Sequence, residues 1–191
     1  MIFVSFAHVT GPSISVGKHG NAIFIPTTGG TGNMVINLGT HEHDCFGNIG
    51  LCPNGATFSL WFKPLELSTE FGTLFRSSSL VAYMHQTSAG AVVHFNLNNG
   101  SHIFNFFNMQ RVAWDQWYHV GITYSRTSGF AVYFNRCAPY LPDKIKAYNK
   151  TIKNFELGCS TGMTCGRVHL DDLRFWTVKK STQFIWNLFN M

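Results

Sequence analysis

Two histidines, two acidic residues and two cysteines lie close together in the segment GTHEHDCFGNIGLCPNG, residues 39–55. Imidazole nitrogens, thiolates and carboxylates are the groups that bind zinc in proteins. His41 and His43 alternate, so an extended segment could aim both rings at one metal. They lack the His-Glu-x-x-His spacing of a helical zinc site, and nothing in the sequence marks a third ligand group. We therefore expect a solvent-facing loop that binds metal only adventitiously.

The two cysteines of this segment offer a second chemistry. A redox pair is normally Cys-x-x-Cys at the start of a helix in an α/β protein, whereas six residues separate Cys45 from Cys52. A structural disulfide fits this spacing better, and closing such a short loop stabilises a fold by about 2–3 kcal/mol. Pro53, Asn54 and Gly55 then turn the chain into the strand that follows.

Three further cysteines and two sequons bear on the compartment. Cys159 and Cys165 are close enough for a local bridge, which leaves Cys137 over, although Cys137 could instead pair with either of them. Asn99-Gly-Ser and Asn149-Lys-Thr match the N-glycosylation pattern. Together these features predict an extracellular or cell-surface glycoprotein.

Length and hydropathy predict one domain over residues 1–191. No apolar stretch approaches the roughly 18 residues that span a bilayer, so we expect no membrane insertion. The first residues, MIFVSFAHVTG, lack the basic region and the cleavage site of a signal peptide. We expect the chain to be a fragment of a larger extracellular protein.

The net charge is +5 and no nucleic-acid-binding motif is present. One basic segment stands out, and it is interpreted either as a solvated loop, which we favour, or as a patch for an anionic ligand. Its basic residues are Arg136, Lys144, Lys146, Lys150 and Lys153.

The elements that must hold these residues are short strands. Charged residues make up only 12% of the chain, whereas Phe and Gly each occur 18 times, a composition typical of strands and tight turns. In TFSLWFK, residues 57–63, every second side chain is apolar, which predicts one buried sheet face with Trp61 on the other, covered by a loop or by another protein. WYHVGITYS and FAVYFN form the clearest hairpin, with its turn at 128–129. Only STQFIWNLF, residues 181–189, has helical spacing, with Ser181 or Thr182 as the N-cap.

Five segments in a fixed order carry a family resemblance. They are HGNAIFI (19–25), CPNGATFSLWFKP (52–64), WYHVGITYS (117–125), AVYFN (131–135) and GRVHLDDLRFWTVKKSTQFI (166–185). In this order they resemble the laminin-G-like and pentraxin-like jelly-roll domains of the concanavalin A-like superfamily. The resemblance implies an all-β, two-sheet antiparallel jelly-roll sandwich with a short C-terminal helix, and a structural role for His119. Arg136 and Cys137 depart from the pattern where a glycine is expected after Asn135, so the turn there must be held differently.

The resemblance also bears on cofactors. In this superfamily an aspartate of the closing strand often helps to bind calcium together with backbone carbonyls, and the matching residue is Asp171. Calcium prefers such oxygen ligands. The alternative is that Asp171 only accepts hydrogen bonds from the backbone at the sheet edge, and both interpretations stay open.

Glycosidases of the superfamily use two carboxylates, one to donate a proton and one to attack or to activate water. No Glu-x-Asp-x-Glu-like run occurs among the nine acidic residues, so we expect no enzymatic activity. The sequence favours a recognition or adhesion module of a receptor or matrix protein, with protein contacts or self-association. A lectin-like or sulfated-glycan-binding domain is the alternative. Trp114, Asn96, Asn98, Asn99 and Asn105 have suitable sugar-binding chemistry, but the sequence does not assign a sugar site.

Overall fold

The structure is a computed structural model that describes residues 2–3, 13–25, 34–40, 45, 49–66, 71–77, 80–98, 103–106, 111–141, 154–159 and 167–191. These residues form the antiparallel two-sheet sandwich with a C-terminal helix that the sequence predicts. None of the helices in this part of the chain is long and apolar enough to cross a bilayer.

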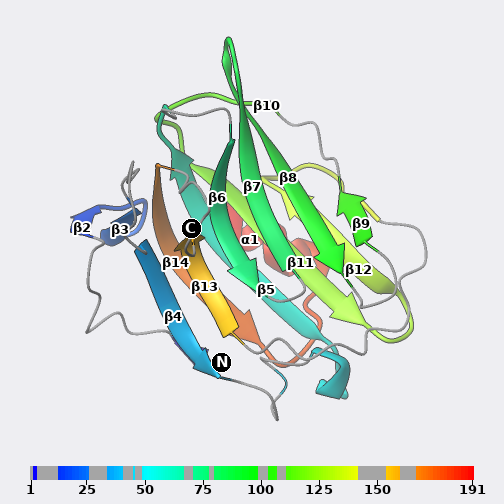
Figure 1. Cartoon of the computed structure of the whole chain (residues 1–191). Coiled ribbons are helices and arrows are strands. Elements are labelled where there is room, and N and C mark those ends of the chain that lie inside the picture. The colour runs from blue at the N-terminus through cyan, green and yellow to red at the C-terminus, as the bar shows by residue number, and fades with distance from the viewer. Residues whose placement is uncertain are drawn as a thin grey trace.

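Two seven-stranded sheets, named A and B, stack on each other (Figure 1). Sheet A contains, in spatial order, β12 (Gly129–Phe134), β11 (Tyr118–Ser125), β5 (Ala56–Pro64), β14 (Val168–Trp176), β3 (Asn21–Ile25) and β2 (Ser13–Val16), and β1 (Ile2–Phe3) pairs with β14. Sheet B contains β10 (Arg111–Val112), β8 (Gly90–Asn98), β7 (Leu80–Thr87), β6 (Phe71–Ser77), β13 (Asn154–Cys159) and β4 (Met34–Thr40), and β9 (Ile103–Phe106) pairs with β8. A 3-10 turn (Ile49–Leu51) precedes β5, and α1 (Thr182–Phe189) follows β14.

Strand β5 is buried on both faces, which corrects the expectation of a single buried face. Phe58, Leu60 and Phe62 point into the core between the sheets, as the alternation predicts. Trp61, on the other face, is also only 2% exposed, because the end of α1 covers it: the rings of Trp61 and Phe189 stack 5.4 Å apart. The predicted cover over Trp61 is thus supplied in part by the helix of the same chain.

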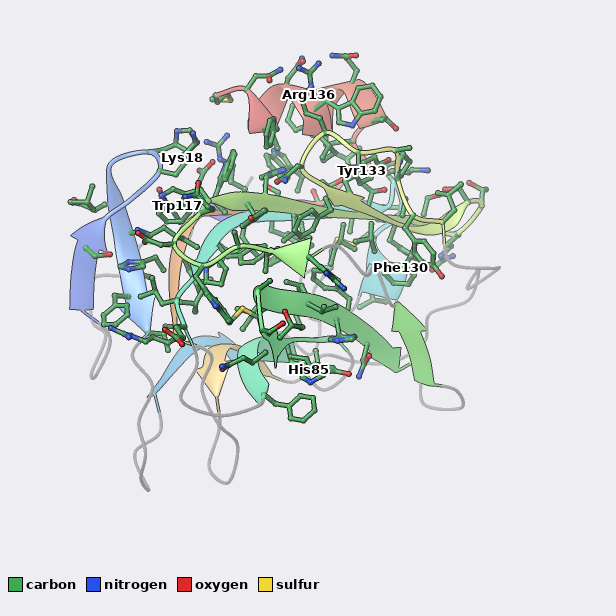
Figure 2. The ribbon with its side chains drawn as sticks, turned by 90° about the horizontal axis from the view of Figure 1, so that it is seen from above. Lys18, His85, Trp117, Phe130, Tyr133 and Arg136 are labelled. Atoms are coloured by element: carbon green, nitrogen blue, oxygen red, sulfur yellow. A yellow bond between two sulfur atoms is a disulfide. The ribbon has the colours of Figure 1, made fainter. Side chains whose placement is uncertain are left out.

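Helix α1 forms a third layer on the outer face of sheet A (Figure 2). Ser181 is its N-cap, with the hydroxyl accepting from the Phe184 amide, as the sequence predicts. Ile185 and Leu188 are buried against sheet A. A Cβ at Gly121 would lie 2.8 Å from Ile185 Cγ2, so the glycine lets the helix approach the sheet.

The predicted β11–β12 hairpin is present, with Ser125 paired to Gly129 across its turn. At the other end of β12, where the family pattern is broken, hydrogen bonds hold the chain. Asn135 adopts a φ of 51°, and its Oδ1 accepts from the His119 amide. Val132 and Tyr140 then exchange two backbone hydrogen bonds, so the returning chain covers part of the edge of sheet A.

Candidate functional site

A disulfide joins Cys45 and Cys52, with their Cα atoms 4.9 Å apart, which is the pairing that the sequence predicts. Cys52 is buried against the core next to the start of β5. The segment that contains these two cysteines is therefore cross-linked where it enters the sandwich. Its histidines, His41 and His43, lie outside the described residues.

Several predicted site residues also lie outside the described part of the chain. They are the sequon residues Asn99 and Asn149, the loop residues Lys144, Lys146, Lys150 and Lys153, and Cys165. Of Cys159 only the backbone is described, in β13, so the predicted Cys159–Cys165 bridge stays a prediction. Arg136 and Cys137 are exposed, and Cys137 lies next to α1, since its carbonyl accepts from Trp186 Nε1 at 3.4 Å.

Asp171, the predicted calcium ligand, holds a turn of the backbone. Its Oδ2 accepts from the His19 amide and its Oδ1 from the Asp172 amide, each at 2.7 Å. The fit is tight, because a Cβ at Gly17 would lie 2.6 Å from Oδ2. This geometry matches the alternative interpretation, in which Asp171 accepts hydrogen bonds from the backbone at the sheet edge.

A calcium ion requires several oxygen ligands, and the surroundings of Asp171 present amide donors instead. The adjacent Asp172 is engaged elsewhere: it adopts a φ of 51° within a bulge of β14, and Arg174 Nε donates to its Oδ1 at 2.5 Å. Among the described residues, no three His, Cys, Asp or Glu side chains gather around one point. The site that the resemblance implies combines Asp171 with backbone carbonyls, so calcium binding remains a prediction from the resemblance.

A partly buried group of polar and cationic side chains on sheet A surrounds Trp61. The ring centroid of His119 lies 5.2 Å from that of Trp61, and the Lys18 ammonium lies 5.2 Å from the indole centroid. Burial, followed by the positive charges of Arg174 and His19, lowers the pKa of His119 to about 4. His119 is therefore neutral at physiological pH. Its side chain is only 1% exposed, which suits a structural role and leaves no surface for a ligand.

A second aromatic group on sheet A has its polar atoms already engaged. Phe24 stacks on His169 at 4.9 Å, and the His169 ring forms a hydrogen bond of 2.6 Å with Ser15. Lys63 pairs with Asp115 at 2.8 Å and lies over the Trp117 ring. Because these groups bind one another, this cluster is a weaker candidate for ligand binding.

The outer face of sheet B presents a different arrangement. Cross-strand pairing places two rows of side chains on the face that points away from sheet A. One row contains Phe71, His85 and Val92, and the next contains Thr73, Tyr83 and His94. We call these six residues together with Asn96 the aromatic face. Figure 2 shows His85 on the far side of the molecule from α1.

The rings of the aromatic face stack in two pairs. Phe71 and His85 lie 4.8 Å apart with an interplanar angle of 16°, and Tyr83 and His94 lie 4.9 Å apart at 13°. Phe71 is 48% exposed, and Tyr83, His85 and His94 are half-buried. The face is therefore a stacked aromatic surface that solvent reaches.

Polar groups accompany these rings. Burial, and then the neighbouring His85, lower the pKa of His94, so His94 is neutral at physiological pH and its ring has one donor and one acceptor. Asn96 Oδ1 is buried and has no hydrogen-bond partner among the described residues. A surface that combines exposed rings, imidazoles and an amide can stack on the apolar side of a sugar and bind its hydroxyls.

The sequence carries a signal for this face in the alternation of its strands. Tyr83 and His85 alternate with the buried Ala82 and Met84, and His94 follows the buried Val93. Asn96, one of the residues with suitable sugar chemistry, does lie on the face. Trp114 is half-buried and packs against the core between the sheets, away from this face. Of Asn98 and Asn105 only the backbone is described.

Comparisons with known proteins agree with this architecture. A family model described as the concanavalin A-like lectin/glucanases superfamily matches residues 38–185. A search of curated proteins gave no match.

Three solved structures illustrate the shared fold. Domain 4 of the extracellular arabinanase AbnA from Geobacillus stearothermophilus, in complex with arabinotriose, has a TM-score of 0.63 and 18% identity, over 93% of this chain and 80% of that one. The heptameric SAP-like pentraxin of Limulus polyphemus has a TM-score of 0.51 and 19% identity, over 71% of this chain and 69% of that one. The binding domain of botulinum neurotoxin DC, in complex with rat synaptotagmin II, has a TM-score of 0.67 and 11% identity, over 94% of this chain and only 45% of that one.

Proposed function

Because the chain belongs to the concanavalin A-like lectin/glucanases superfamily, we propose that it is a carbohydrate-recognition domain that binds glycans on the aromatic face of sheet B. The observation that carries this proposal is the stack of Phe71 on His85, with Phe71 half exposed. A sugar ring has an apolar side, and an exposed aromatic ring offers that side a matching surface.

The polar groups beside the rings support the same ligand class. A sugar hydroxyl both donates and accepts hydrogen bonds, and a neutral imidazole and an amide can do the same. The Oδ1 of Asn96 is buried beneath the face and has no hydrogen-bond partner among the described residues. A buried acceptor without a partner is costly, and a water molecule that also binds a sugar hydroxyl would satisfy it. A purely apolar partner would leave this group unsatisfied.

The comparisons are compatible with this proposal at the level of fold. The arabinanase domain is described in complex with a trisaccharide, although its low identity transfers no site to this chain. The Cys45–Cys52 disulfide supports the extracellular setting that we propose, because disulfides persist in oxidising compartments.

We further propose that the domain recognises glycans without cleaving them. The structure describes the side chains of four acidic residues, Glu66, Asp115, Asp171 and Asp172. Asp115 is paired with Lys63 and Asp172 with Arg174, and Asp171 accepts two backbone amides. These roles are structural, whereas glycoside hydrolysis needs two carboxylates that flank the scissile bond.

Binding to a broad glycan array tests the proposal. We expect the native domain to bind a defined subset of glycans, and Phe71→Ala and Tyr83→Ala to lose that binding while keeping the native melting temperature within a few degrees. The matched control is Tyr140→Ala, because Tyr140 is an aromatic residue of similar exposure, 41%, at the edge of sheet A. If the native domain binds no glycan, or if the two face variants bind as well as it does, the proposal is wrong.

Protein contact and self-association, which the sequence favours, stay predictions. The pentraxin is described as a heptamer and the neurotoxin domain as a complex with synaptotagmin, so this fold is compatible with both. Light scattering over a range of concentrations tests self-association without reference to glycans.

A further inference from the structure

We infer that the glycan carries an acidic group, a carboxylate or a sulfate, and that Arg111 binds this group at one end of the aromatic face. The inference rests on the proposed function, because it names the ligand class for the same site. It is carried by the register of four neighbouring strands and by the distribution of charge.

The register places Arg111 in line with the exposed rings. Phe71 pairs with His85, His85 with Val92, and Val92 with Arg111. Directly paired residues of antiparallel strands lie on the same face of a sheet. Arg111 is exposed, and it therefore continues the row that begins at Phe71.

The length of this row suits a short oligosaccharide that crosses the strands. Neighbouring strands lie about 4.8 Å apart, so three strand steps separate the backbones of Phe71 and Arg111 by about 14 Å. A neutral sugar ring that stacks on Phe71 and His85 would then place a following residue of the glycan near Arg111. The half-buried Val92 lies between the two ends.

The charges along the row favour an anion. No described acidic side chain forms an ion pair with Arg111; the described pairs are Lys63–Asp115 and Arg174–Asp172. Lys63, Asp172 and Arg174 belong to sheet A, and Asp115 lies in the loop between β10 and β11, where it is paired with Lys63. None of the residues of the aromatic face is acidic. A guanidinium binds carboxylate and sulfate groups through two parallel hydrogen bonds, so Arg111 adds charge and orientation to a surface that otherwise stacks on a sugar and binds its hydroxyls.

The test uses matched glycans on the same array. Lactose is compared with sialyllactose, which adds a carboxylate, and with sulfated lactose, and every other neutral glycan is printed beside its sialylated and sulfated derivatives. We expect the native domain to bind one acidic series about tenfold or more tightly than its neutral parents, because a charge-assisted hydrogen-bond pair contributes on that scale. The two series distinguish carboxylate from sulfate.

Variants connect this preference to one residue. Arg111→Gln should lower the affinity for acidic glycans to the level of their neutral parents, and Arg111→Lys should keep part of the preference. Arg167→Gln is the matched control, because Arg167 is also exposed but immediately precedes β14 on sheet A. Phe71→Ala should weaken the binding of acidic and of neutral glycans by the same factor.

The remaining outcomes separate the two proposals. Equal binding of acidic and neutral glycans, or a preference that survives in Arg111→Gln, overturns the role of Arg111 while glycan recognition stands. Failure of the native domain to bind any glycan on the array overturns the proposed function and the inference with it.

Discussion

His119 lies 5.2 Å from Trp61, centroid to centroid, in the layer between sheet A and helix α1. The two side chains come from adjacent paired strands, since His119 is the register partner of Trp61. The Nδ1 of His119 and the Nε1 of Trp61 are both buried, and neither has a hydrogen-bond partner among the described residues. Protonation of His119 would therefore place a charge where solvent does not reach.

We predict that the domain loses stability as pH falls from about 6.5 to about 4. The pKa of His119 is lowered from 6.5 to about 4 in the folded state, so in this range the unfolded chain binds a proton that the folded chain does not. The contribution of neutral His119 is complete above pH 6.5 and is lost progressively below it, by about 3 kcal/mol in total. Urea denaturation at several pH values measures this slope, and His119→Gln should flatten it. An identical slope in the variant would contradict the prediction.

Asp171 should stabilise the domain through its backbone contacts. Asp171→Asn replaces one acceptor oxygen by a donor that faces an amide, so we expect a loss of about 1–3 kcal/mol in the free energy of unfolding. Asp115→Asn is the control, because the Asp115 side chain is 71% exposed in its pair with Lys63 and such surface pairs contribute little to stability.

Calcium provides a separate measurement on the same residue. From the donors around Asp171 we expect the melting temperature to be equal in calcium and in a chelator. A rise with calcium that disappears in Asp171→Asn would instead support the metal site that the family resemblance implies.

Gly121→Ala should displace helix α1. The new methyl group would lie 2.8 Å from Ile185 Cγ2, and such overpacking typically costs about 1–3 kcal/mol. Ile185→Ala removes the atoms that oppose the new methyl group, so the double variant should be more stable than the sum of the two single effects predicts. Chemical denaturation of the native domain, the two single variants and the double variant measures this coupling. Additive effects would show that the glycine does not set the approach of the helix.

Cys45→Ser with Cys52→Ser should lower the free energy of unfolding by about 2–3 kcal/mol, because the open loop gains conformational freedom in the unfolded chain. The far-UV circular dichroism spectrum should keep its strand signature, since the loop lies before β5. Equal stability of the native domain under oxidising and reducing conditions would contradict a stabilising bridge.

The sequence predicts which segments form strands and the helix better than it predicts which side chains pack against one another. Alternation in β5 and in the β11–β12 hairpin, and the cap at Ser181, depend on residues close in the chain, so local patterns suffice. Burial of Trp61 depends on Phe189, which is distant in sequence, and alternation alone does not identify what covers an outward side chain.

The candidate site was missed for a related reason. Its members come from different strands, and only the pairing of Phe71 with His85 and of Tyr83 with His94 brings their rings together. The sequence instead drew attention to the clustered His41 and His43, because nearness in the chain is visible without a structure while strand register is not.

Helix α1 covers sheet A and leaves the middle strands of sheet B as an outer surface (Figures 1 and 2). Substitutions at Trp61 or Gly121 must satisfy neighbours on both sides. Substitutions at Phe71 or His85 meet neighbours mainly on one side. With the aromatic face as the binding surface that we propose, descendants of this sequence can change what they bind by varying sheet B while sheet A preserves the fold. Ligand preference and stability can then evolve largely independently.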